Sequence, residues 1–266
     1  MNPSPGLITE PQAQDLPIIG GNSAAIMTER PHFPPIFQPY AITADLDPID
    51  QAVDMAEKGT DAGTLLWNTR QDAYECAIVL APEYPLLDSL PIVLVAGLGL
   101  GNALGALVPP VVAVTFGWPD RIEINGGVVG SVRIVLAKTP NPNAIPDWLV
   151  IGFHLANSGH WKPKDAAGRQ MTTLAAEGCK IDILDLLEAF SRHFLAWINR
   201  WQSDGMQPVQ QAWMSRTLDA GKHLSIDVDG VRSEGKFKGL NDQGGLELVA
   251  EGRQQVVPLD IVLPSV

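Results

Sequence analysis

The stretch from Val111 to Asn157 constrains the fold more than any other part of the chain. Apolar and polar residues alternate on both sides of Trp118-Pro119-Asp120 and of Asn125-Gly126-Gly127. Alternation with a period of two is typical of half-buried strands, and Asn and Gly supply the positive φ that tight turns require. We therefore predict an antiparallel meander that ends in a strand from Asp147 to Asn157.

Composition limits the class of protein. With 266 residues, 45% of them hydrophobic, the chain can bury one large core and a small satellite domain. A formal net charge of −12 repels phosphate backbones, which disfavours nucleic-acid binding. Cys76 and Cys179 have no Cys-x-x-Cys spacing, so we expect no disulfide scaffold and no metal site. A reducing cytoplasm fits this cysteine usage, and no signal peptide is evident.

An uncharged run from Ser89 to Pro119 is long enough to span a bilayer. Its flanks are Asp88 and Asp120, where a membrane helix would carry Lys or Arg on the cytoplasmic side. Pro109-Pro110 divide the run into a mostly helical half and a β-branched half. We therefore expect a buried helix that leads to a central strand, and no membrane association.

The same run contains Gly97-Leu98-Gly99-Leu100-Gly101, which raises the alternative of a dinucleotide-binding loop. Residues 92–96 would be the strand before that loop, and Asp120 lies about 20 residues further on. The glycine spacing fails, however, because Asn102 and Leu104 occupy the two possible positions of the third glycine. Small residues in an apolar helix more often let it lie close to a neighbouring element, and this is what we expect.

The rest of the chain supplies helices and a second group of strands. Residues 1–30 contain scattered Pro and Gly and few large apolar groups, so we expect them to be disordered. Asp47 before Pro48 is a helix start signal. The spacing predicts helices over 47–58, 182–201 and 208–216, strands over 63–67 and 75–81, and short strands over 223–228, 235–240, 246–249 and 256–263. The short strands suggest a small barrel, so we divide the chain into domains over 31–217 and 221–266.

The order of these pieces resembles the biotin/lipoate protein ligase family. Trp118-Pro119-Asp120 stands where that family has K-W-P-N-D, and Val128-Val129-Gly130 where it has the end of K-x-x-G. Ile151-Gly152 stands at I-G-x-G-I-N, and residues 172–178 stand at T-S-L-x-x-E-G. The resemblance implies an α+β fold of the class II aminoacyl-tRNA synthetase-like type. This is a mixed, largely antiparallel sheet with helices, followed by an SH3-like C-terminal β-barrel.

Active members of this family bind ATP and a carboxylic acid such as biotin or lipoate, form an acyl-adenylate, and transfer the acyl group to a lysine of a biotinyl or lipoyl carrier protein. This chemistry needs cations, because the phosphates and the transition state carry dense negative charge. The family supplies a G-R-G-R-x-G-R loop and two lysines. Here the loop is cut short, Gly117 and Gly127 replace the lysines, and only Arg70 remains as a cation.

The resemblance implies a set of site residues. The segment that holds the polar head of the acid falls near Asp47-Pro48-Ile49. Candidate catalytic residues are His154, Asp120 and Cys179, and candidate ligand contacts are Arg70, Trp67, Trp118, Gly130 and Gly152. Plainer interpretations stay open: a strand-ending turn at Trp118-Pro119-Asp120, a hydrogen-bonded core histidine at His154, and an inert buried thiol at Cys179 in place of one activated by a helix N-terminus.

Two functions remain compatible with these residues. The first is a divergent ligase-like protein that binds an acyl ligand or an acyl carrier and transfers the acyl group to a carrier-protein lysine after a different kind of activation. The second is a catalytically inactive pseudo-ligase that acts as a protein-interaction module. The sequence does not choose between them.

Overall fold

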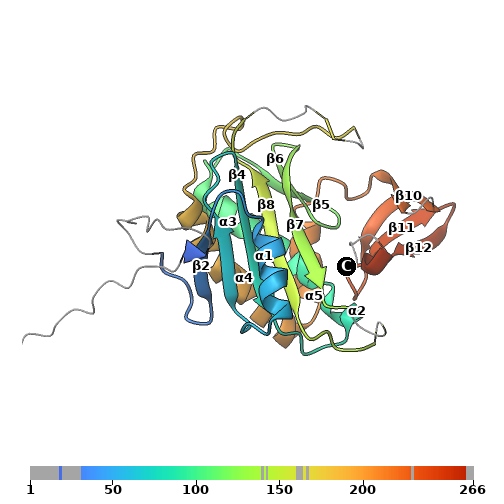
Figure 1. The fold of residues 1–266 in the computed structure, drawn as a ribbon. Coiled ribbons are helices and arrows are strands. Elements are labelled where there is room, and N and C mark those ends of the chain that lie inside the picture. Colours follow the sequence, from blue (N-terminus) through green and yellow to red (C-terminus); the bar gives the residue numbers. More distant parts are fainter. Residues whose placement is uncertain are drawn as a thin grey trace, which may run out of the picture.

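The computed structural model describes residues 18–19, 31–138, 141, 143–159, 164–165, 168–228 and 231–261 (Figure 1). The expectation of disorder for residues 1–30 lies outside the described residues, apart from Ile18–Ile19, which form a short strand.

One sheet of eight strands forms the centre of the molecule. Its order is β1-β2-β3-β4-β8-β7-β6-β5, in which β1, β2 and β3 run parallel and all other neighbours are antiparallel. The strands are β1 (Ile18–Ile19), β2 (Gln38–Ile42), β3 (Thr64–Asn68), β4 (Ala73–Leu80), β5 (Val114–Gly117), β6 (Arg121–Ile124), β7 (Gly127–Leu136) and β8 (Leu149–Ala156). The predicted mixed, largely antiparallel sheet is confirmed.

The predicted meander is strands β5 to β8. The turn between β6 and β7 has positive φ at Asn125 (51°) and Gly126 (84°), which is the reason for the Asn-Gly pair. The turn between β5 and β6 contains a cis peptide bond at Trp118-Pro119.

Within the described residues, five helices flank this sheet: α1 (Pro48–Glu57), α2 (Leu86–Ser89), α3 (Ile92–Leu107), α4 (Ile183–Asp204) and α5 (Gln207–Met214). Asp47 caps α1 by accepting a hydrogen bond from the Ile49 amide, and Asp182 caps α4 in the same way at Leu184. The predicted starts of both helices are thus confirmed. Gly205, at φ 74°, ends α4.

The helices cover the two faces of the sheet unequally. Helices α3 and α4 lie on one face and build the larger core, whereas α1 lies on the other face over β3, β4 and β8 (Figure 1). Helix α3 is buried along most of its length. Residues 86–107 are long and apolar enough to cross a membrane, but 78% of the most hydrophobic window is buried inside the protein, as in a core helix.

The strand after α3 is not central. We expected the run from residue 89 to 119 to end in a central strand, but β5 lies at the edge of the sheet. Its apolar side chains have another partner, because the Phe116 ring stacks on Trp213 of α5 at 5.9 Å between ring centroids. Residues 92–96, the strand required by a dinucleotide-binding loop, are helical, and that alternative is therefore wrong.

The C-terminal part is a small antiparallel sheet of order β12-β11-β10-β9, consistent with the expected SH3-like module. Its strands are β9 (His223–Val228), β10 (Val231–Leu240), β11 (Leu246–Ala250) and β12 (Arg253–Val257). Strand β12 ends earlier than predicted because Pro258 has no amide to continue the ladder. The module is attached to the main core through Phe237, whose ring lies 6.4 Å from Trp213, and through the Trp118 Nε1 hydrogen bond to the Gly244 carbonyl at 3.0 Å.

The close contact of α3 and α4 depends on one glycine of the Gly97–Gly101 run. A methyl group on Gly99 would lie 2.9 Å from Phe194 Cα, whereas a methyl group on Gly97 would meet nothing within 4 Å. We expect Gly99→Ala to lower the free energy of unfolding by about 1–3 kcal/mol through overpacking. Gly97→Ala, the matched control, should raise it by about 0.5–1 kcal/mol through helix propensity. Urea unfolding of both variants measures the difference, and equal effects would contradict the packing role.

Candidate functional site

A group of polar side chains lies at the end of the sheet where β3 ends, on the face that α1 covers. We call it the polar cluster; its members are Asp47, Asn68, Arg70, Asp72, Glu75, Arg133 and His154. Alternate side chains of a strand lie on the same face of the sheet. On this face the side chains beneath α1 are apolar, and those that lie beyond the first residue of α1 are polar. The same face of the sheet therefore carries a hydrophobic region under α1 and ionisable groups next to it.

Glu75 is the centre of this polar cluster. Its carboxylate is almost fully buried, accepts a hydrogen bond from the Asn68 amide, and lies 2.6 Å from His154 Nδ1. Arg70 adds a guanidinium at 3.8 Å. Burial alone would raise the pKa of Glu75, but the hydrogen bonds from His154 and Asn68, and the charge of Arg70, hold this pKa below its usual value. The carboxylate is therefore ionised at neutral pH.

Asn68 leaves one buried atom unsatisfied. Its Nδ2 group donates to the Leu46 carbonyl at 3.2 Å and to Glu75, which fixes the orientation of the amide. Its Oδ1 atom is buried and has no hydrogen-bond partner within the described residues. Buried acceptors are almost always paired in native proteins. This oxygen is therefore a candidate contact for a donor group of a ligand.

The two arginines of the polar cluster are paired with carboxylates. Arg70 binds Asp72 through two hydrogen bonds of 3.0 and 2.8 Å. Arg133 of β7 donates to Asp47 Oδ2 at 2.6 Å, while the other carboxylate oxygen of Asp47 caps α1. Burial would raise the pKa of Asp47, but Arg133 and the amides of the helix start keep it low. Neither guanidinium is an uncompensated positive charge.

The structure brings two of the eight sequence-predicted site residues into this cluster, His154 and Arg70. Gly130 and Gly152 lie on the adjoining strands β7 and β8. A Cβ on Gly130 would lie 1.9 Å from the His154 carbonyl oxygen, and one on Gly152 would lie 2.0 Å from the Cys76 carbonyl oxygen. Both glycines are thus required for strand packing, and a ligand contact at them stays a prediction.

The two predicted tryptophans are elsewhere. Trp67 points into the larger core on the opposite face of the sheet, where its ring centroid lies 6.1 Å from that of Phe33. Trp118 packs against the C-terminal sheet through its bond to Gly244. The structure does not bring either ring to the polar cluster.

Asp120 and Cys179 are also separate from His154. The neighbour of Asp120, Arg121, pairs with Ser131, which in turn pairs with His154, so two strand spacings intervene. Burial raises the pKa of Asp120 despite nearby guanidiniums. Burial and the charge of Glu177 also raise the pKa of the Cys179 thiol, contrary to the activated thiol that a helix N-terminus suggested. The inert thiol is the better interpretation of Cys179.

The sequence analysis did not identify Asn68, Glu75 or Arg133 as site residues. Glu75 carried a usable signal, because it is the one charged residue in the strand Ala73–Leu80, in which nearly every residue is buried. A charge in a buried strand needs partners, so Glu75 could have been proposed as a site residue, but its pairing with His154 is known only from the structure.

A second group of cations was likewise missed. A cavity of about 420 Å³ lies between the turn that carries Trp118 and the C-terminal sheet, and Arg121 and Arg169 both line it. Arg121 Nε lies 3.8 Å from Glu123 Oε1, and Arg169 Nε lies 2.6 Å from Asp165 Oδ2. Arg70 is therefore not the sole cation near the expected site. Each of these guanidiniums faces a carboxylate, but Arg121 Nε is buried and has no hydrogen-bond partner within the described residues.

The two positions at which the resemblance expects lysines are filled by neighbouring side chains. A Cβ on Gly117 would lie 2.3 Å from Arg121 Nη2, and one on Gly127 would lie 2.9 Å from Thr172 Cγ2. The loss of the lysines is therefore accompanied by packing that occupies their space.

Comparisons with known proteins agree on one relationship. The sequence profile of the biotin/lipoate A/B protein ligase family matches residues 33–215. A biotin–[acetyl-CoA-carboxylase] ligase of Paracoccus denitrificans is 26% identical over 183 residues, 68% of this chain and 75% of the relative. A biotin protein ligase-like protein of unknown function from Silicibacter sp. TM1040 is 35% identical with a TM-score of 0.79, over 88% of this chain and 100% of that one. The apo biotin protein ligase of Aquifex aeolicus, at 19% identity over 83% of this chain and 95% of that one, has a TM-score of 0.68 and is alike in fold.

The ionised state of Glu75 predicts a pH dependence of stability. Because the pKa of Glu75 is lower in the folded state than in the unfolded state, its stabilisation is present above about pH 4.3 and is lost as the pH falls through the folded value. We expect Glu75→Gln to lower the free energy of unfolding at pH 7 by about 1–3 kcal/mol. The gap between this variant and the wild type should narrow below about pH 4.3.

Urea unfolding between pH 3 and pH 7 measures that gap. Glu57→Gln on the exposed side of α1 removes the same charge and should follow the wild type throughout. A gap between wild type and Glu75→Gln that stayed constant with pH would contradict the role assigned to Glu75.

Proposed function

This chain belongs to the biotin/lipoate A/B protein ligase family, and from that premise we propose that it binds a biotin- or lipoate-type acyl group at the polar cluster and transfers it, already activated, to a lysine of a carrier protein. The observation that carries the proposal is the contact of 2.6 Å between His154 Nδ1 and the ionised carboxylate of Glu75. The curated relative from Paracoccus denitrificans is named for acetyl-CoA carboxylase, which supports a biotinyl carrier as the partner.

Charge balance argues against formation of an acyl-adenylate. Adenylation requires cations that are free to bind phosphate, because the phosphates carry concentrated negative charge in the transition state and this charge must be stabilised by groups already in place. Arg70 and Arg133 are each held by a carboxylate within 3 Å, and glycines stand at positions 117 and 127, where the family has lysines. ATP is therefore not a cofactor of the reaction we propose, and the acyl group enters as a thioester.

The buried oxygen of Asn68 supports ligand binding. Its Oδ1 atom lies beside the Glu75 carboxylate, and a polar group of the acyl ligand with a hydrogen to donate would satisfy it. Buried polar atoms that lose such a partner cost about 1–3 kcal/mol, so a matching ligand gains affinity and orientation there.

The chemistry that follows is general base catalysis. The Glu75 carboxylate accepts a hydrogen bond from Nδ1–H of His154, so Nε2 is the basic nitrogen. The His154 side chain is 28% exposed. The carrier lysine amine attacks the thioester carbonyl carbon, the C–N bond forms, and Nε2 takes the proton from the attacking nitrogen. The C–S bond then breaks, and the imidazolium returns the proton to the thiolate. The products are an amide and a free thiol.

We further propose that this reaction occurs in the cytoplasm. Both cysteines are free and buried, which supports a reducing compartment.

Replacement of the base tests the mechanism. We expect His154→Gln to lower the rate of acyl transfer from an octanoyl or biotinyl thioester to a biotinyl carrier domain by about 100-fold or more, the usual contribution of a positioned base. Mass spectrometry of the carrier lysine measures the rate. The control is His223→Gln on the exposed strand β9, which should react as the wild type does. Equal rates for wild type and His154→Gln would contradict the proposal.

A catalytically inactive, carrier-binding protein is the second candidate, favoured by the filled positions at Gly117 and Gly127. Both candidates predict no pyrophosphate release above background from ATP with biotin, lipoate or octanoate in a coupled assay. They differ in that the second predicts carrier binding without transfer from any thioester. Sustained pyrophosphate release by the wild type would contradict both candidates.

A further inference from the structure

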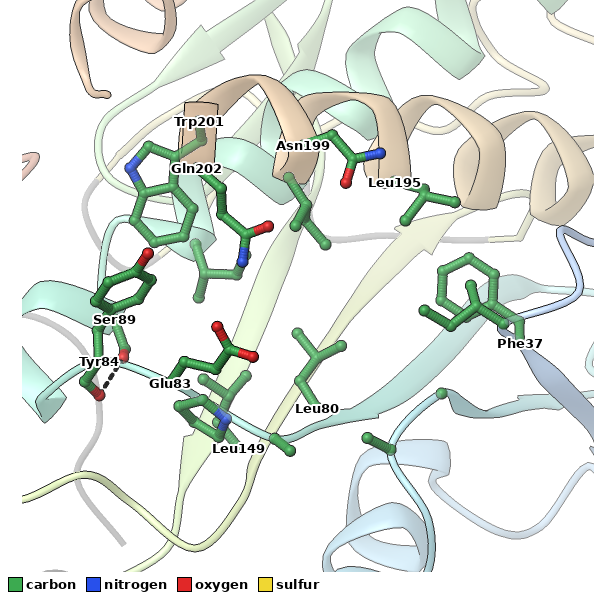
Figure 2. A pocket seen from close by; sticks show the side chains of 17 residues that line it. Phe37, Leu80, Glu83, Tyr84, Ser89, Leu149, Leu195, Asn199, Trp201 and Gln202 are labelled. Atoms are coloured by element: carbon green, nitrogen blue, oxygen red, sulfur yellow. Dashed lines mark hydrogen bonds between the residues drawn. The ribbon is translucent and has the colours of Figure 1, made fainter. Parts of the chain in front are cut away.

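A cavity of about 280 Å³ lies at the opposite end of β3, β4 and β8 from the polar cluster, on the face that α4 covers (Figure 2). Gly63 precedes β3, Leu80 ends β4 and Leu149 begins β8, whereas Asn68, Glu75 and His154 lie towards the other ends of the same strands. The cavity therefore takes no part in the acyl chemistry proposed above.

We propose that this cavity is a second binding site, for a small apolar amine whose ammonium group is held by Glu83 while its hydrocarbon part enters the cavity. The volume is near the lower limit for small-molecule pockets, which begin at about 300 Å³. A single short hydrocarbon chain or ring fits this size better than an extended cofactor.

The inner wall is apolar. Ile92 of α3, and Leu195 and Ile198 of α4, meet the strand ends at Leu80 and Leu149. None of these side chains carries a hydrogen-bonding group. A ligand gains free energy here by removing hydrocarbon surface from water, at about 25 cal/mol for each Å².

The polar residues at the rim carry one sign of charge. Glu83 is the only carboxylate among the lining residues that the structure describes, and Figure 2 shows its side chain pointing into the cavity. Within the described residues this carboxylate makes no hydrogen bond and no ion pair. Among the described residues no Lys, Arg or His lines the cavity, and the nearby Arg200 is held over the Trp197 ring at 5.3 Å.

The aromatic residues of the rim add to this preference for a cation. Tyr84, 45% exposed, and Trp201 of α4 both line the cavity, and aromatic ring faces attract ammonium groups. The Ser89 hydroxyl is occupied by the Tyr84 carbonyl at 3.0 Å. The amides of Val93, Leu94 and Val95 in the first turn of α3 are bonded to the carbonyls of Leu90 and Pro91, so these three amides are not available to an anion. Together with the net charge of −12, the rim favours an ammonium over an anion.

Three probes with the same six-carbon chain test the proposal on the full chain: n-hexylammonium, 1-hexanol and hexane-1-sulfonate. NMR of methyl-labelled Ile and Leu residues follows each titration. We expect saturable shifts at the methyl groups of Ile36, Leu195 and Ile198 with hexylammonium, binding about three- to fivefold weaker with hexanol, and the weakest binding with the sulfonate.

Variants separate charge from cavity. Glu83→Gln should weaken hexylammonium binding by about three- to fivefold and leave the affinity for hexanol unchanged. Glu57→Gln, the control, should alter neither affinity. Ala62→Trp, at an exposed position of the rim, should block both probes without disturbing the core. Equal affinities for hexylammonium and hexanol, an unchanged affinity in Glu83→Gln, shifts at other methyl groups, or no saturable shift with any probe would each overturn the proposal.

Discussion

The architecture of the polar cluster depends on one buried carboxylate, Glu75. An ion in a buried strand costs several kcal/mol unless partners compensate it, so the segments next to Glu75 must supply such partners. β3 supplies Asn68, β8 supplies His154, and the segment after β3 supplies Arg70. The hydrogen bonds that keep Glu75 ionised also fix the orientation of the His154 ring, in which Nε2 is the nitrogen that does not face Glu75. Stability and chemistry at this site therefore have the same origin.

The family relationship and the charge distribution favour different functions. The first rests on the fold, and the second on individual side chains near the site. The sheet, the helices and the C-terminal module match biotin protein ligase folds. Within that fold, the described guanidiniums near the site, of Arg70, Arg121, Arg133 and Arg169, each lie within 4 Å of a carboxylate. A carboxylate close to a guanidinium reduces the positive potential that would attract a phosphate. The fold of this chain is thus similar to that of the biotin protein ligases, while the charge distribution depends on its individual residues.

The fold was more predictable from the sequence than the site. Local signals determine elements such as α1 and α4, since Asp47 and Asp182 cap them and Gly205 ends the second. The predicted central position of β5 was wrong. An apolar strand has the same sequence pattern at an edge that α5 covers as at the centre of a sheet. The carboxylate partner of the predicted His154 was missed, since Glu75 and His154 are 79 residues apart and only strand pairing makes them neighbours. Pairing register is a tertiary property that local spacing does not encode.

The two sheets differ in the backbone that they leave open to another chain. The large sheet ends in β1, of two residues, and in β5, of four, where the Phe116 amide also bonds the Arg216 carbonyl at 3.1 Å. The small sheet ends in β9, of six residues, and β12, of five. Short or covered margins resist edge-to-edge aggregation, whereas longer ones can accept an added strand. Any association by β-augmentation would therefore extend the C-terminal module and leave the ligase-like sheet untouched.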